Sequence, residues 1–119
     1  MSALKISLKR AYLQPVDEDG QRILVERLWP RGLTKDKAAI DHWVKNIAPT
    51  PELRKWYGHE PDRWPEFQRR YRDELGANSD EVLALESLCA NGQVAFIFAA
   101  KDEGRNSAVV LREFLMERA

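Results

Sequence analysis

Residues 96–108 read FIFAAKDEGRNSA, and within them a short apolar run gives way to charged and amide side chains. The apolar, aromatic-rich residues 94–99 predict a buried strand, and residues 108–118 predict a helix with Asn106 or Ser107 as its N-cap. In open α/β folds, ligands bind at the carboxyl ends of strands, where backbone N–H groups and the helix dipole favour an anion. The sequence therefore indicates where a site lies, without defining a reaction.

Two further strands are predicted upstream of this stretch. Ile6 and Leu8 alternate with polar residues in the first strand, and residues 23–28 form a second apolar run. Asp19-Gly20 marks a turn between them. The connection is about as long as a minimal parallel crossover and also fits an antiparallel hairpin with a long loop, so the direction of the first strand stays open.

Apolar residues at helical spacing, together with capping residues, predict five helices. Thr50 and Pro51 suit the N-cap and first position of one helix, and Gly58 suits its end. The helices are predicted over residues 40–47, 51–57, 64–75, 80–90 and 108–118. We therefore expect an α/β fold in which a small, at least partly parallel three-stranded sheet is flanked by about five helices. The length of 119 residues fits a single domain over residues 1–119.

Composition narrows the expected partners and location. Nineteen Lys and Arg residues balance nineteen Asp and Glu residues, so there is no excess positive charge to attract a polyanion and nucleic acid is not an expected partner. Cys89 is the only cysteine, which excludes an intrachain disulfide and fits a reducing cytoplasm. The chain has no apolar run long enough for a signal peptide or a membrane span, so we expect a cytoplasmic protein without a membrane partner.

Two arginines follow the second predicted strand. Arg27 lies near the end of the apolar run, and Arg31 lies between the turn residues Pro30 and Gly32. Guanidinium groups bind carboxylate or phosphate in a bidentate geometry, so both arginines are candidate ligand-binding residues. The alternative is a structural ion pair at the strand end, for example with Glu26.

Three polar residues follow the third predicted strand, and they face the first group if the two strands are neighbours. Asp102 suits a general base and Lys101 suits neutralisation of developing charge, so these two are the candidate catalytic residues. Asn106 is a candidate for hydrogen bonding to a ligand. Each polar group also has a structural alternative, since Asn106 suits a helix cap and Asp102 suits a turn.

His59 lies in a turn between two predicted helices, where it either reaches a cleft or hydrogen-bonds the next helix. His42 and His59 are the only histidines, and neither has a Cys or a second His at metal-ligand spacing, so no metal site is expected. The sequence also lacks a Walker loop and a dinucleotide-binding fingerprint, and no cofactor is expected.

Several blocks of sequence carry a resemblance that spans nearly the whole chain. The blocks are residues 10–12 (RAY), 28–33 (LWPRGL), 48–56 (APTPELRKW), 58–59 (GH) and 99–102 (AAKD), followed by Asn106. Together they resemble the domain-of-unknown-function 488 (DUF488) family, in its short YeaO-like branch. The resemblance implies a small bacterial-type α/β domain that carries Glu26, Arg27 and Arg31 on one strand-end loop and Lys101, Asp102 and Asn106 on another.

The resemblance also limits the chemistry. Longer relatives in that family carry a Cys-His-Arg triplet in the region corresponding to the last loop, whereas this chain has Arg105-Asn106-Ser107 there. The resemblance therefore does not imply cysteine-based catalysis. The branch more often has Asp where this chain has Glu26, which is one methylene longer.

Our leading hypothesis is a cytoplasmic α/β domain that binds a small anionic or polar ligand at the strand-end cleft, with catalysis left open. The alternative is a protein-interaction or oligomerisation module without chemistry, in which exposed aromatic residues such as Trp56 and Trp64 anchor a partner. A homo-oligomer is compatible with both hypotheses.

Overall fold

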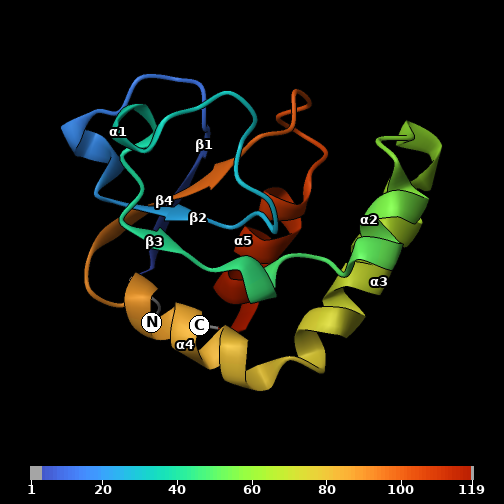
Figure 1. Cartoon of the computed structure of the whole chain (residues 1–119). Coiled ribbons are helices and arrows are strands. Elements are labelled where there is room, and N and C mark those ends of the chain that lie inside the picture. The colour runs from blue at the N-terminus through green and yellow to red at the C-terminus, as the bar shows by residue number, and fades with distance from the viewer. Residues whose placement is uncertain (1–3, 119) are drawn as a thin grey trace.

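The computed structural model describes residues 4–118, which form a four-stranded sheet with helices around it (Figure 1). β1 (Lys5–Arg10) lies at one edge and pairs with β4 (Gln93–Phe98). β4 also pairs with β2 (Gln21–Leu24), and β3 (His42–Trp43) lies at the other edge. All three pairings are parallel, so the first strand runs in the same direction as its neighbours.

The α/β class is confirmed, but the predicted strand count of three is wrong because β3 was not recognised. The helix predicted over residues 40–47 is wrong for the same reason. The N–H groups of Asp41 and Val44 donate to Arg22 and Leu24 of β2, at 2.8 and 3.0 Å, and thereby extend the sheet. A short 3-10 helix, η2 (Lys45–Ile47), follows.

The apolar spacing in this segment has a different cause from the one predicted. Ile40 packs against the cluster on one face of the sheet, which includes Leu24 and Ile97. Val44 and Ile47 pack into the cluster on the opposite face. One face of a helix would have sent all of these side chains to the same side, whereas an extended segment crossing the sheet edge divides them between both sides.

Within residues 4–118 the structure has five α-helices, and four of them lie where the sequence predicts them. These four are α2 (Pro51–Tyr57), α3 (Trp64–Gly76), α4 (Ser79–Cys89) and α5 (Ser107–Arg118). α1 (Lys35–Ala38) was not predicted, since four residues are too few to show a helical period. Two further 3-10 helices are η1 (Asp17–Asp19) and η3 (Pro61–Arg63).

The main core lies between the sheet and α3, α4 and α5, which cover one of its faces (Figure 1). Phe96 and Phe98 of β4 are fully buried there together with Tyr71 of α3 and Leu111 of α5. The opposite face has a smaller core built on Ala95 and Ile97 of β4, which loop residues and α1 cover. β4 is buried on both faces, which explains its unbroken apolar sequence.

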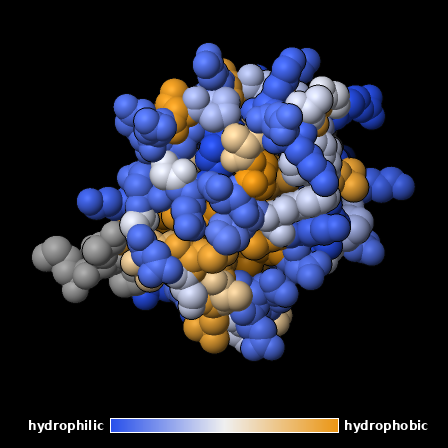
Figure 2. All heavy atoms as spheres, turned by 60° about the vertical axis from the view of Figure 1, so that its left-hand side comes forward, coloured by the Kyte–Doolittle hydropathy of each residue, from blue (hydrophilic) through white to orange (hydrophobic). Residues whose placement is uncertain are grey.

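The face of the molecule shown in Figure 2 is predominantly hydrophilic. On the face shown in Figure 2, apolar side chains emerge in small groups between charged and polar ones. In the part of the chain that the structure describes, no helix combines the length and the apolar character that a membrane span requires.

Candidate functional site

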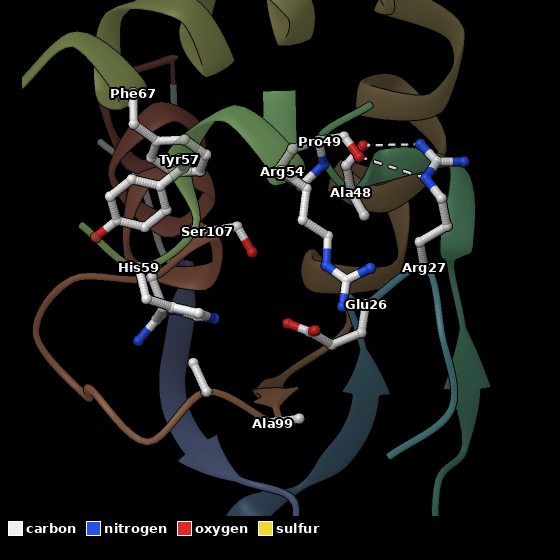
Figure 3. Close-up of a pocket in the computed structure, with 12 residues that line it drawn as sticks. Glu26, Arg27, Ala48, Pro49, Arg54, Tyr57, His59, Phe67, Ala99 and Ser107 are labelled. Carbon is white, nitrogen blue, oxygen red and sulfur yellow. Dashed lines mark hydrogen bonds between the residues drawn. The ribbon is translucent and has the colours of Figure 1, made fainter. Parts of the chain in front are cut away.

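A pocket of about 190 Å³ opens at the carboxyl ends of β2 and β4 (Figure 3). Its wall comes from four parts of the chain: the residues after β2, the stretch from residue 48 through α2 and the turn after it, Phe67 of α3, and the residues after β4 up to the start of α5. Four residues expected to bind a ligand line this pocket, namely Glu26, Arg27, His59 and Asn106. The pocket therefore lies at the strand ends that the sequence indicates.

Glu26 leaves the sheet where β2 ends. The N–H of Val25 donates to the carbonyl oxygen of Ile97 at 3.2 Å, and this is the last hydrogen bond between the two segments before they diverge. The Glu26 side chain is half-buried and points into the pocket (Figure 3). Burial raises the pKa of Glu26, while the charge of Arg54 and the N–H of Ala99 oppose that rise.

Arg54 also lines the pocket, and its guanidinium points toward the Glu26 carboxylate (Figure 3). It lies on α2, which begins after Thr50, whose hydroxyl accepts a hydrogen bond from the N–H of Leu53 at 3.3 Å. Among residues 4–118, none forms a hydrogen bond or a close ion pair with the Arg54 guanidinium. Its positive charge is therefore available to a ligand.

Arg27 also lines the pocket, but its guanidinium turns outward to the backbone (Figure 3). It donates to the carbonyl oxygens of Ala48 and Pro49, at 3.0 and 3.3 Å. Arg27 thus secures the segment that leads into α2 and builds one wall of the pocket.

Asn106 is buried, and both polar atoms of its side chain have backbone partners. Its Nδ2 donates to the carbonyl oxygen of Asp102 at 2.8 Å, and its Oδ1 accepts from the N–H of Val109 at 3.1 Å, so Asn106 is the N-cap of α5. This arrangement fixes where α5 starts, and with it the position of Ser107 in the pocket wall.

The remaining predicted residues lie outside the pocket lining. The carboxylate of Asp102 accepts hydrogen bonds from the backbone N–H groups of Gly104 and Arg105 and from the Arg105 side chain, at 2.9 to 3.1 Å. Burial raises the pKa of Asp102, but these hydrogen bonds outweigh it and hold the pKa below its ordinary value. Lys101 and Arg31 are exposed.

Aromatic side chains form the wall opposite Glu26 (Figure 3). Tyr57 stacks on Phe67 with ring centroids 4.4 Å apart, and the ring of His59 lies 5.9 Å from that of Tyr57. The backbone at His59 is left-handed, with a φ of 58°, directly after Gly58 with a φ of 51°. Two consecutive left-handed residues turn the chain sharply, and this turn brings His59 back to the pocket.

Sequence reasoning missed Arg54, Tyr57 and Ser107 as pocket residues. Arg54 lies within the 48–56 block that carries the family resemblance, and this was the signal that could have identified it. For Ser107, the signal was its position in the loop after the third predicted strand, because ligands in open α/β folds bind at the carboxyl ends of strands.

Other candidate chemistry lies elsewhere or is absent. Cys89, the last residue of α4, is buried and lies outside the pocket lining, and burial raises its pKa to about 11. Residues 4–118 contain no cluster of three His, Cys, Asp or Glu side chains that could hold a metal ion. The Trp56 ring is half-buried beneath Arg70, whose guanidinium lies 4.4 Å from the ring centroid, and Trp64 stacks on Phe67.

Comparison with known proteins identifies relatives of this chain. Residues 5–119 match the family model described as the inactive DUF488-N3 subclade. The uncharacterized protein Rv3073c of Mycobacterium tuberculosis (strain ATCC 25618 / H37Rv) is 38% identical over 114 residues, which cover 96% of each chain. The uncharacterized protein YeaO of Escherichia coli (strain K12) is 37% identical over 112 residues, which cover 94% of this chain and 97% of the relative. No solved structure gives a significant match.

Proposed function

Because the chain belongs to the DUF488 family, and matches a subclade described as inactive, we propose that it binds a small anionic or polar ligand at the strand-end pocket without turning it over. The ligand is smaller than a typical drug-sized molecule, since the pocket of about 190 Å³ falls below the usual range for such sites.

The observation that carries the proposal is the guanidinium of Arg54, which forms no hydrogen bond with residues 4–118 and points into a pocket at the carboxyl edge of a parallel sheet (Figure 3). His59 and the Ser107 hydroxyl line the same space, and residues 4–118 provide neither of them with a hydrogen-bond partner. A ligand with an anionic group would satisfy these donors. The Arg54–anion interaction is of the charge-assisted type, which is about twice as strong as a neutral hydrogen bond.

Binding without catalysis is favoured by the state of the candidate catalytic groups. Asp102, the candidate general base, lies outside the pocket lining and is held by three hydrogen bonds that lower its pKa, which makes it a weaker proton acceptor. Cys89, the only thiol, is buried and its pKa is raised. Neither group is poised to act on a ligand beside Arg54.

A thermal-shift screen tests the proposal. The panel contains phosphate, sulfate, mononucleotides, and small carboxylic acids with and without an amino group. A ligand at a hundred times its Kd stabilises the folded state by about 2.7 kcal/mol, which raises the Tm of a chain of this size by several degrees.

Matched variants locate the binding. Arg54→Gln should abolish the shift, whereas Lys55→Gln, on the next residue of the same helix and outside the pocket lining, should preserve it. The proposal fails if no compound raises the Tm of the unaltered protein, or if Arg54→Gln binds as well as Lys55→Gln.

A further inference from the structure

The pocket presents two opposite charges that do not meet. Glu26 and Arg54 both line it and point toward one another on one side of it (Figure 3), and the charge of Arg54 acts on Glu26, but within residues 4–118 they form no close ion pair. Elsewhere in the protein, side chains of these types close to contact, as in Arg118 with Glu86 at 3.1 Å and Arg105 with Asp102 at 2.9 Å. The carboxylate of Glu26 and the guanidinium of Arg54 therefore both remain open to contact with a ligand.

A ligand with only one charge would fit this pair poorly. A simple anion that binds Arg54 is brought close to the half-buried carboxylate of Glu26, and the like charges repel. A simple cation that binds Glu26 meets the positive charge of Arg54 in the same way. A molecule with one charge of each sign satisfies both side chains, and each single-charge analogue is rejected by the group that it leaves unpaired.

Size restricts the ligand further. The volume of about 190 Å³ lies below the range of drug-sized ligand pockets, so the ligand is a small molecule. The rings of Tyr57 and Phe67 offer an apolar wall on the other side of the pocket from the two charged groups, against which methylene groups can pack (Figure 3).

Building on the proposed function of this pocket, we propose that its ligand is a small zwitterion that places an ammonium group on Glu26 and a carboxylate on Arg54. The ligand class is that of short amino acids with a few methylene groups between the two charges. Glu26 is the specificity-determining residue, because it distinguishes an amino acid from the corresponding simple carboxylate.

Calorimetric titration of the unaltered protein with three matched series tests this proposal. The first series contains glycine, β-alanine, γ-aminobutyrate and δ-aminovalerate. The second contains the carboxylates of the same chain lengths without the amino group, and the third contains the corresponding amines without the carboxylate. We expect at least one amino acid to bind ten times or more tightly than both its carboxylate and its amine counterpart.

The outcomes separate this inference from the proposed function. If carboxylates bind as tightly as the amino acids of the same length, or only phosphate, sulfate or mononucleotides bind, the zwitterion proposal is overturned while anion binding at the pocket stands. If no compound in any series or in the anion panel binds, both proposals are overturned.

Variants then assign the discrimination to Glu26. Glu26→Gln, which keeps the side-chain shape, should reduce the preference for the amino acid over its carboxylate to less than threefold, and Lys55→Gln should leave it unchanged. Circular dichroism and the Tm verify that Glu26→Gln is folded, and Glu26→Ala provides a second neutral variant if it is not. A preference that persists in the folded neutral variant would assign the ammonium to another residue and overturn the role of Glu26.

Discussion

Gly20 illustrates how one residue without a side chain permits close packing of two segments. Its φ is 67°, and a Cβ atom added to it would lie 2.0 Å from the carbonyl oxygen of Gln93, at the start of β4. Gly32 has a similar φ of 76°, but a Cβ atom there would meet nothing within 4 Å. Substitutions at the two glycines therefore allow the free-energy cost of a left-handed backbone to be measured apart from the cost of a steric clash.

We expect Gly32→Ala to lower the free energy of unfolding by about 1 kcal/mol, the cost of a left-handed conformation for a residue with a side chain. Gly20→Ala should lower it by about 3 kcal/mol, because overpacking adds to that cost. Urea denaturation of both variants provides the measurement. Equal decreases in the free energy of unfolding would mean that the backbone near Gln93 moves away from the added methyl group without a free-energy cost.

Asp19 is the centre of a buried charge network on the face of the sheet that carries the smaller core. Its carboxylate accepts hydrogen bonds from Lys9 at 3.1 Å, from Arg22 at 2.6 Å and from the N–H of Val16 at 3.1 Å. Arg22 is also buried and donates to the carbonyl oxygen of Ala38. Burial raises the pKa of Asp19, but the hydrogen bonds outweigh that effect and the pKa lies below its ordinary value of 3.8.

Asp19→Asn should lower the free energy of unfolding by about 3 kcal/mol at pH 7, since it leaves the buried Arg22 without its counter-charge. Because the folded pKa is depressed, the carboxylate contributes fully above pH 3.8, and this contribution is lost as the pH falls through the folded value. The stabilities of variant and unaltered protein should therefore converge in acid.

Glu86→Gln is the matched control, because its ion pair with Arg118 lies at the surface, where solvent screens the two charges. Denaturation curves recorded from pH 7 down to pH 2 test the comparison. Parallel pH profiles for the unaltered protein and Asp19→Asn would contradict the role of the Asp19 carboxylate.

At the scale of elements, the correct helix predictions depended on local signals. Thr50 and Pro51 at the start of α2, and Asn106 at the start of α5, act through their own neighbouring residues, so their effect can be read without tertiary structure. The segment from residue 40 to 47 had no such signal, and its apolar spacing fits a helix and an extended segment at a sheet edge equally well.

Tyr71 connects α3 to η2 and to the main core. It is 1% exposed, and its hydroxyl donates to the carbonyl oxygen of Ile47 at 2.7 Å. Tyr71→Phe should lower the free energy of unfolding by about 1 to 2 kcal/mol, because the buried carbonyl loses its donor. Tyr71→Ala should lower it by about 4 kcal/mol, because a cavity is added to that loss.

Tyr12→Phe is the control for the hydrogen bond. The hydroxyl of Tyr12 donates to the carbonyl oxygen of Arg31 at 3.0 Å in an exposed position, where water can replace it. Chemical denaturation should show little change for this variant. If Tyr12→Phe lowered the free energy of unfolding as much as Tyr71→Phe does, burial would not determine the free-energy cost of removing the hydroxyl.

At the scale of the whole molecule, balanced charge predicts weak interaction with nucleic acid. The formal net charge is zero at pH 7, so binding of DNA would release few counterions. We expect a Kd weaker than about 10 μM for duplex and single-stranded DNA at physiological salt, with no sequence preference. Fluorescence anisotropy at several salt concentrations measures this; sub-micromolar binding with a steep salt dependence would refute it.

The location of the pocket could be predicted, but the residues that line it could be predicted only in part. The strand-end rule indicated the residues after β2 and β4, and Glu26 and His59 do point into the pocket there (Figure 3). The rule could not show which arginine faces inward. Arg27 was the natural choice by position, yet its guanidinium binds backbone carbonyl groups, and Arg54 faces the pocket instead.

The sequence by itself therefore determined the α/β class, four of the helices and the edge of the sheet where polar groups gather, because caps and apolar periods act over a few neighbouring residues. Only the tertiary structure decided that β4 lies between β1 and β2, and that α2 delivers Arg54 opposite Glu26. The physical reason is that this pocket joins segments more than twenty residues apart, whose adjacency follows from strand order and packing on both faces of the sheet.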